Sequence, residues 1–450
     1  MHPWFHKLMI KAAVPKRLQM LAMLRQRVGW GPEQIRAYQE ARLQQVINQC
    51  WHHVPFYRRH WQGAIAGPQD IRHIEDLQRL PLLTKDHVRE NLQSLVTTDP
   101  TIESSEARTG GSTGQPIIFR MTDEDEQLAW AQMYLGWTWA GWRVGDPFLV
   151  VGGESVGVGL GDRRTRRDWV INRWATSGSN LTLERTRALV QMPHFNAIRM
   201  IYGYPNSIRE LCEFLVELGE RPRALRCVIC TAEVMRPEVR ARIADVLGVD
   251  CVLDQWGLND GGMHACEGVE QDGLHLSFHR GILELVDDAG QLIVETGRAG
   301  RAIATTLTNP AMPFVRYETG DQVHWQTDVP SSSGIHWPRI GPVDGRTGDV
   351  IYLRNGRSIP MPGLTLVMRW MEGLKSYQFI QTAPDAVTVR LDRGPGFALD
   401  EQQVRDFLCA RISPDVAWTV AWAAPEYTRN GKLLIIRNDW LRKQGLSRPC

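Results

Sequence analysis

The chain has 450 residues, of which 43% are hydrophobic and 23% charged, and its formal net charge at pH 7 is +2. This composition is ordinary for a globular protein, and the length predicts two or three domains. A nearly balanced charge gives no support for a nucleic-acid or membrane partner. We find neither a signal-peptide pattern nor a run of about 18 uncharged apolar residues, so we expect a cytoplasmic protein without a membrane span.

The first hundred residues are predicted to be mostly helical. Between Pro32 and Cys50, apolar residues recur at helical spacing, which predicts one amphipathic helix. The proline in the segment His53–Trp61 ends that helix. Further along, Thr84 precedes another helical run and is expected to be its N-cap.

A parallel sheet with covering helices is predicted for the middle of the chain. The apolar run 147–153 ends in glycines, as a buried strand does. Two further apolar runs, 225–233 and 249–257, flank a helical pattern at 237–248. A strand, a helix and a second strand at this spacing are typical of parallel pairing.

Shorter strand-like runs follow from Gly273. They lie at 273–288, 290–297, 300–308 and 314–325, with turn residues between them, and predict an antiparallel β-rich subdomain. Beyond Gly345 the pattern is that of a small unit with a strand (VTVRL), a helix (DEQQVRDFLCARI), a second strand (WTVAWAA) and a terminal hairpin ending in LLIIR.

The predicted fold class is therefore α/β. We expect a large N-terminal domain, residues 1–345, with parallel or mixed sheets and the β-rich subdomain. A small mobile α+β domain, residues 346–450, should follow it.

The eight cysteines are scattered, which favours reduced thiols over a disulfide framework. Cys227 and Cys230 form a C-x-x-C spacing, but the apolar residues around them favour a buried strand over a redox or metal site. Cys266, His264 and His275 could form part of a zinc site, for which no fourth ligand is evident.

A loop rich in small residues stands out at 107–119, ARTGGSTGQPIIF. Three glycines and three hydroxyl residues lie between Thr109 and Gly114. Glycines let the backbone N–H groups approach a phosphate, and the hydroxyls add donors, although a surface turn has the same composition. No Gly-Lys-Ser/Thr follows, so this is not a Walker A loop.

A second glycine-rich stretch, 150–161, does not fit the dinucleotide fingerprint, because Asp162 stands where the last glycine should be. The arginines at 163–167 could meet phosphates, but flanking aspartates favour a solvated loop.

Four shorter motifs follow the loop in order: DQWGLNDGG (254–262), YETGD (317–321), GRTGD (345–349) and RNGKLLIIR (429–437). Each alone is weak. Together with TGGSTGQP they resemble the core motifs of the adenylate-forming ligases. Within these ligases the chain resembles the phenylacetate–CoA ligase branch, and most closely its CapK-like members. The segments that carry this resemblance are HVPFYRRHW, LPLLTKDHVRENL, GLNDGGMHACEG followed by GLHL, and NPAMPFVRYETGD. The resemblance spans residues 45–435.

This resemblance implies an ATP site and assigns roles to residues in it. The implied ATP-binding residues are Thr109, Gly111, Ser112, Thr113, Gly114, Ala232, Glu233, Asp254, Trp256, Gly257, Asp321 and Arg346. Trp256 replaces the family's adenine-stacking Tyr, and Asp260 replaces its Mg²⁺-binding Glu. Asp321 would bind the ribose hydroxyls. Asp349 would be the hinge, and Lys432 would bridge the substrate carboxylate and the α-phosphate. Asp260 and Lys432 are thus the catalytic candidates.

The reaction that the resemblance implies is activation of a carboxylic acid by ATP–Mg²⁺ to an acyl-adenylate, followed by transfer of the acyl group to an acceptor. The acceptor stays open between coenzyme A, a carrier-protein thiol, an amine and a hydroxyl. Tyr202, Tyr204 and Trp137, the last within a cluster of tryptophans at 130–142, would suit a flat acid. The alternative is a degenerate nucleotide-binding scaffold, which the change to Asp260 favours. A kinase or nucleotidyltransferase would instead release ADP or transfer the nucleotide.

Overall fold

The computed structural model describes residues 3–108, 117–153, 156–158, 164–178, 181–326, 331–343, 345–346, 350–353, 358–360, 364, 367–368, 370–427 and 433–443. The chain divides into two compact units. The large unit comprises Met1–Thr319 and Val323–Val343, and the small unit comprises Gly320–Gln322 and Asp344–Cys450.

Helices dominate the N-terminal part of the large unit. They are α1 (Pro3–Ala13), α2 (Pro15–Gln26), α3 (Pro32–His53), α4 (Pro55–His60), α5 (Lys85–Glu90) and α6 (Leu92–Leu95), with short 3₁₀ turns at Pro68–Asp70 and Ile74–Arg79. Proline at the first position of α2, α3 and α4 fixes φ where no helical N–H partner is needed. Thr84 caps α5 as predicted, because its hydroxyl accepts from the His87 N–H at 3.2 Å.

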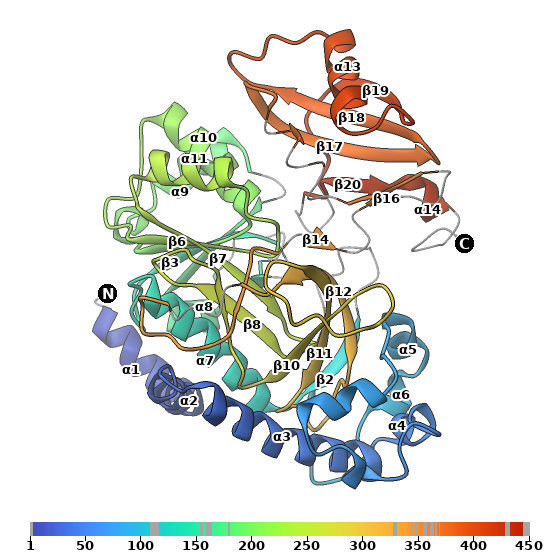
Figure 1. Ribbon diagram of the computed structural model, residues 1–450. Helices are drawn as coiled ribbons and strands as arrows, with labels where there is room; N and C mark the ends of the chain where they lie inside the picture. Colours follow the sequence, from blue (N-terminus) through green and yellow to red (C-terminus); the bar gives the residue numbers. More distant parts are fainter. Residues whose placement is uncertain are drawn as a thin grey trace. The chain divides into compact units, whose positions relative to one another are not determined.

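An eight-stranded sheet forms the centre of the large unit (Figure 1). Its order is β13-β9-β8-β7-β6-β5-β3-β4. The strands are β3 (Phe148–Gly152), β4 (Arg173–Ser177), β5 (Met200–Gly203), β6 (Cys227–Thr231), β7 (Cys251–Leu258), β8 (Met263–Glu267), β9 (Leu274–Leu276) and β13 (Arg339–Ile340). Pairing is parallel from β4 to β7 and antiparallel from β7 to β13, so the predicted parallel sheet is confirmed.

Both faces of the parallel part are covered, which explains its continuous apolar strands. Alternate residues of β3 illustrate the two faces: Val150 packs into the cluster that contains α7 (Asp123–Trp139), whereas Val151 packs into the cluster that contains α10 (Pro205–Leu218). Helices α9 (Leu183–Val190) and α11 (Pro237–Leu247) lie with α10, and the short α8 (Arg166–Val170) precedes β4 (Figure 1).

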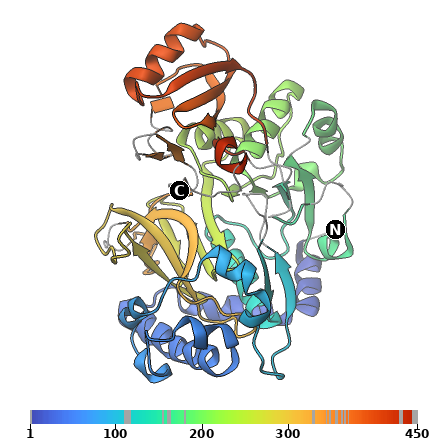
Figure 2. The ribbon, with the colours of Figure 1, turned by 90° about the vertical axis from the view of Figure 1, so that its right-hand side faces the viewer.

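A second sheet has the order β10-β11-β12-β14. Its strands are β10 (Gly281–Val286), β11 (Ala299–Thr306), β12 (Tyr317–His324) and β14 (Gly345–Arg346), and a separate hairpin joins β1 (Ser105–Arg108) to β2 (Ile118–Met121). Helices α3 to α6 lie beside the strands of this sheet (Figures 1 and 2), and a shared core includes Tyr57, Ile282 and Tyr317, whereas α2 packs against α7.

The antiparallel β-rich subdomain is thereby confirmed, but one predicted strand is wrong. Residues 290–297 form no strand and contribute only the isolated bridges Val286–Leu292 and Thr296–Trp325. The segment returns from a turn at Asp287 beside β10, but it bridges to β10 only at Leu292 and then to Trp325 at Thr296, so no continuous ladder forms.

The small unit contains a four-stranded sheet of order β19-β18-β17-β20. Its elements are β15 (Val350–Tyr352), β16 (Ser358–Pro360), β17 (Leu374–Ala383), β18 (Ala386–Arg393), α13 (Glu401–Arg411), β19 (Ala417–Trp422), β20 (Ile436–Asn438) and α14 (Asp439–Lys443). The Asp400 carboxylate caps α13 by accepting from the Gln403 N–H at 2.8 Å.

None of the helices in the described parts of the chain is long and apolar enough to cross a membrane.

Candidate active site

The predicted site residues of the large unit gather where the parallel strands end. Strand β5 ends at Gly203, before Tyr204, and β6 ends at Thr231, before Ala232 and Glu233. Register pairs Thr231 with Gln255 on β7. Ligands of open α/β sheets bind outside the carboxyl ends of the strands, so the carboxyl ends of β5, β6 and β7 mark the candidate site.

The turn after β6 is held in an unusual backbone conformation. Ala232 has φ of 68°, a left-handed value that costs a non-glycine residue about 1 to 3 kcal/mol and persists only when neighbours hold it. The Glu233 carboxylate accepts from the Asn206 side-chain N–H at 2.8 Å, and Arg236 donates to the Asn206 side-chain oxygen at 3.1 Å. These contacts tie the turn to the start of α10.

A buried aromatic group lies between α7 and the sheet. The Trp137 and Tyr202 rings have their centroids 5.0 Å apart. The indole N–H of Trp137 donates to the side-chain oxygen of Gln255 at 3.2 Å, and the Gln255 side-chain amide donates to the Tyr202 hydroxyl at 3.3 Å. Burial raises the pKa of Tyr202, so its hydroxyl stays protonated. The structure thus brings two of the three predicted acid-pocket residues together.

Tyr204, the third predicted pocket residue, is fully buried at the start of α10, where its ring packs beside Gly152. Gln255 was missed by sequence reasoning. A polar residue within the apolar run of β7 was the available signal.

The turn after β7 carries Asp260. Its carboxylate lies 3.0 Å from the Tyr317 hydroxyl, and Trp256 precedes it on β7. Both acid and tyrosine are buried, and Tyr317 opens the predicted YETGD motif. A carboxylate of this kind suits Mg²⁺, which prefers oxygen ligands and binds proteins through one or two carboxylates together with substrate phosphates.

Asp254 lies on β7, on the same side of the strand as Trp256, and belongs to a buried cluster of charged residues. Its N–H donates to Glu267 at 2.7 Å, and Arg240 makes two hydrogen bonds to Glu267 at 2.8 and 2.9 Å. Burial, reinforced by the neighbouring Glu267 and opposed by Arg240, raises the pKa of Asp254 to about 7. These contacts give Asp254 a packing role in addition to the predicted nucleotide role.

Asp321 is buried on β12, opposite Arg346 on β14 in antiparallel register. The remaining predicted residues lie outside the described residues: Thr109, Gly111, Ser112, Thr113, Gly114, Asp349 and Lys432. Gly257 is exposed next to Trp256.

The cysteine and histidine candidates are buried groups. Burial lowers the pKa of His264 to about 3 and that of His275 to about 4, and raises the pKa of the Cys266 thiol, so near pH 7 all three are neutral. Among the residues that the structure describes, no group of three His, Cys, Asp or Glu side chains is placed to hold a metal ion.

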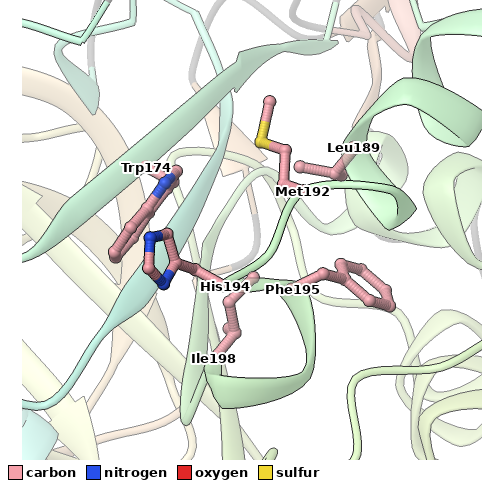
Figure 3. Close-up of a pocket in the computed structure, with 6 residues that line it drawn as sticks. All are labelled: Trp174, Leu189, Met192, His194, Phe195 and Ile198. Carbon is pink, nitrogen blue, oxygen red and sulfur yellow. The ribbon is translucent and has the colours of Figure 1, made fainter. Parts of the chain in front are cut away.

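A small apolar pocket lies at the β4 edge of the sheet and is lined by Trp174, Leu189, Met192, His194, Phe195 and Ile198 (Figure 3). The Arg164 guanidinium stacks on Trp174 at 3.9 Å and donates to the Arg173 carbonyl, so this arginine is engaged locally. The pocket contains none of the predicted site residues.

Comparison with solved structures shows which fold the chain has. A solved 2-hydroxyisobutyryl-CoA ligase, in the postadenylation state with R3-HIB-AMP, covers 93% of this chain and 93% of its own, with a TM-score of 0.72 and 21% identity. The fold is that of the adenylate-forming ligases. No protein-family model matches the chain.

Curated proteins of similar sequence include phenylacetate-coenzyme A ligases and a CapK protein. A phenylacetate-coenzyme A ligase of Thermus thermophilus is 28% identical over 359 residues, which are 77% of this chain and 78% of the relative. Protein CapK of Staphylococcus aureus is 22% identical over 326 residues, 71% of this chain and 70% of the relative. The predicted resemblance to the phenylacetate–CoA ligase branch, CapK included, is confirmed.

Proposed function

We propose that this protein is an ATP-dependent ligase that converts a carboxylic acid to an acyl-adenylate and transfers the acyl group to coenzyme A. The observation that carries the proposal is the similarity to phenylacetate-coenzyme A ligases over 77% of the chain. The chain has the adenylate-forming fold, and Tyr202, Glu233 and Trp256 lie at or just after the carboxyl ends of the neighbouring strands β5, β6 and β7.

The proposed nucleotide site uses the predicted residues. Trp256 stacks on adenine, the Ala232–Glu233 turn borders it, and Asp321 accepts from the ribose hydroxyls. Residues 109–114 hold the β- and γ-phosphates, and Arg346 reaches the nucleotide. Asp260 is the proposed Mg²⁺ ligand, and the bound ion would neutralise phosphate charge.

The proposed reaction has two steps. A carboxylate oxygen attacks the α-phosphorus, and the bond to the leaving pyrophosphate breaks. The thiol sulfur of coenzyme A then attacks the acyl carbon, loses its proton, and displaces AMP. Lys432 contributes a positive charge where the carboxylate and α-phosphate oxygens crowd together, and such charge stabilisation is worth several kcal/mol.

Trp137, Gln255 and Tyr202 form the proposed deep wall of the acid site. Their hydrogen bonds are made to one another, so the wall offers ring surface rather than a charge to the acid. This favours an acid with a flat apolar part. A carrier-protein thiol or an amine remains a candidate acceptor in place of coenzyme A.

One observation favours a second function. Asp260 stands where the family has Glu, and a carboxylate one methylene shorter reaches less far toward a metal ion. A degenerate ligase that binds ATP without activating an acid would explain this change.

Pyrophosphate release with a panel of carboxylic acids separates these functions. We expect the wild-type chain to release pyrophosphate and AMP with at least one acid, and a thioester to form when coenzyme A is added. Lys432→Ala should reduce pyrophosphate release by roughly 100-fold or more. ADP as product would contradict adenylation, and ATP binding without release for any acid would favour the scaffold.

Lys375 provides the matched control. It lies in the same unit and forms a 3.6 Å ion pair with Asp392 at the surface. Lys375→Ala should leave the rate within about twofold, because exposed ion pairs contribute little.

A further inference from the structure

A buried ion pair lies beneath the turn that carries Asp260. The Arg280 guanidinium donates to both carboxylate oxygens of Asp125, at 2.9 and 2.6 Å, and both side chains are only 2% exposed. The pair joins the first turn of α7 to the residue before β10, 155 positions away in sequence. Removing one partner alone would leave an unpaired buried charge, so this arginine and this aspartate act as a unit.

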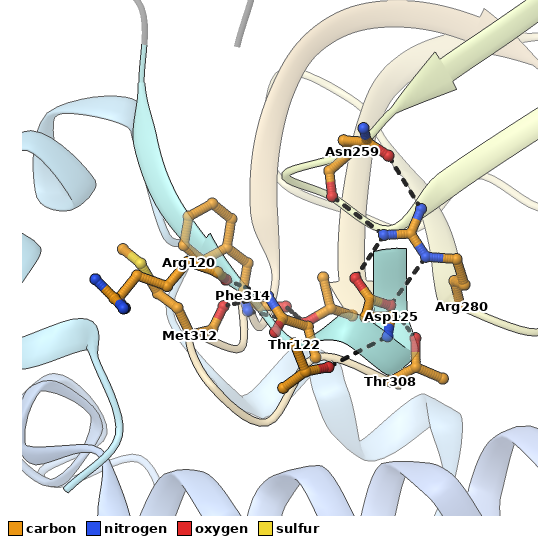
Figure 4. A network of polar contacts seen from close by, with 10 residues as sticks. Arg120, Thr122, Asp125, Asn259, Arg280, Thr308, Met312 and Phe314 are labelled. Atoms are coloured by element: carbon orange, nitrogen blue, oxygen red, sulfur yellow. Dashed lines mark hydrogen bonds and ion pairs between the residues drawn. The ribbon is translucent and has the colours of Figure 1, made fainter. Parts of the chain in front are cut away.

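The same guanidinium also contacts the turn itself. Its third nitrogen donates to the Asn259 side-chain oxygen at 3.3 Å, and Figure 4 shows the guanidinium between Asp125 and Asn259. Asn259 is exposed and directly precedes Asp260, which contacts Tyr317 at 3.0 Å. The turn is therefore held on one side by Arg280 and on the other by Tyr317.

The other side of the pair reaches the hairpin that flanks the glycine-rich loop. Thr308 donates to Asp125 at 2.5 Å, and the neighbouring Asn309 donates to the Arg120 carbonyl oxygen of β2 at 2.8 Å (Figure 4). Strand β2 follows the loop at 109–114 in sequence, and the Thr122 hydroxyl at the end of β2 caps α7. One buried network thus connects the β2 hairpin to the Asp260 turn.

We propose that Asp125 and Arg280 are a positioning pair that fixes the Asn259–Asp260 turn relative to the β2 hairpin, so that both segments meet the same ATP–Mg²⁺. This rests on the proposed function. A fork-shaped guanidinium held by a buried carboxylate has no rotational freedom, so its remaining N–H groups aim at Asn259. A pair of purely structural value would not need this contact to Asn259, an exposed residue next to the predicted Asp260.

The test replaces the whole pair with apolar residues. Asp125→Leu/Arg280→Met removes both charges together, so that no unpaired charge is left buried. We expect the dissociation constant for ATP–Mg²⁺, measured by titration calorimetry, to rise roughly tenfold, because displaced site segments bind and react poorly. The KM for the acid should stay within about twofold, since the acid wall contains neither residue.

A matched control is available in the same unit. Arg316 and Glu284 form a second buried pair at 3.2 Å, with 6% and 4% exposure, and this guanidinium donates to the backbone carbonyls of residues 78 and 80 instead of to Asn259. Glu284→Leu/Arg316→Met should leave ATP–Mg²⁺ binding within about twofold of wild type. Equal weakening in both double variants, or wild-type binding in the Asp125/Arg280 variant, would overturn the proposal.

Arg280→Lys keeps the test decisive if the double variant fails to fold. Lysine can pair with Asp125 but has a single ammonium group, which cannot also reach Asn259, so weaker ATP–Mg²⁺ binding is again expected. Binding is read without turnover. If the wild type binds ATP–Mg²⁺ but releases no pyrophosphate with any acid, the proposed function fails, and the positioning proposal is still decided by the dissociation constants.

Discussion

Asp254 shows how a single buried carboxyl makes stability depend on pH. Its pKa is raised to about 7 by burial and by Glu267, whereas an unfolded chain leaves it near 3.8. Below the unfolded pKa both states are protonated. As pH rises toward 7, the unfolded state loses the proton first, so folding stability falls, and the full loss is reached above pH 7.

Asp254→Asn should therefore stabilise the protein more at pH 8 than at pH 5. The gain at pH 8 is at most about 4 kcal/mol, because the buried amide carries no charge to desolvate. Chemical unfolding at the two pH values measures it. Asp250→Asn, at the exposed position just before β7, is the control and should change the free energy of unfolding equally at the two pH values. A gain for Asp254→Asn that does not grow with pH would contradict the raised pKa.

The candidate site was predictable at positions where residue type carries the signal. Trp137 and Tyr202 were predicted as pocket residues and do lie together, because large rings in a buried sheet have few other places to go. Their polar partner Gln255 and the pairing of Asp125 with Arg280 were not predictable, since no local pattern relates residues 118 or 155 positions apart. Those contacts depend on which strand adjoins which helix.

At the scale of elements, α7 positions Trp137 by packing closely on β8, and Gly136 makes this approach possible. A Cβ at Gly136 would lie 2.9 Å from both the Cβ and the Sγ of Cys266, which is buried on β8. Register places Cys266 opposite Gln255, the partner of the Trp137 indole. The glycine, the cysteine and the proposed acid wall are thus parts of one contact.

Gly136→Ala should consequently destabilise the protein despite the better helix propensity of alanine. Overpacking costs about 1 to 3 kcal/mol, and the propensity gain offsets about 1 kcal/mol of it. We also expect the KM for the acid to rise, because the helix must move away from Gln255. Denaturant midpoints and acid titrations measure both effects.

Two variants test this interpretation. Gly29→Ala, where nothing lies within 4 Å of the added Cβ, should leave stability unchanged. Cys266→Ala introduced beside Gly136→Ala removes the sulfur from the contact and should recover part of the stability. An undisturbed Gly136→Ala protein would show that α7 shifts at no cost.

The elements with strong periodicity were predicted from sequence. The strand predicted at 290–297 was wrong, and this error has a physical cause. The helices at 32–53 and 237–247 and the strands at 148–152 and 227–231 follow apolar patterns that few alternatives can satisfy. Residues 290–297 have the composition of a strand, yet Ile293 is buried while Val294 is 71% exposed, and the segment makes only isolated bridges. Strand composition is therefore not sufficient, because the folded sheet decides whether a segment pairs along its whole length or only at single bridges.

For the whole molecule, the division into two units makes the connection between them the central question. The longer segment of the small unit begins at Asp344, five residues before Asp349, the hinge predicted from the sequence. A ligase that carries out adenylation and acyl transfer at one nucleotide site must exchange the groups around that site between the two steps. Hinge residues permit such an exchange by changing φ and ψ, and proline fixes φ near −65° and removes the N–H.

Asp349→Pro should therefore change the two half-reactions unequally, because one backbone conformation is favoured over the other. Pyrophosphate release reports the first step, and thioester formation from a supplied acyl-adenylate and coenzyme A reports the second. We expect the ratio of the two rates to change by roughly tenfold or more, and by less than about twofold in Asp349→Ala, where φ remains free. If both rates fall by the same factor in the proline variant, residue 349 supports the fold or the site as a whole, and the exchange between steps must occur elsewhere in the chain.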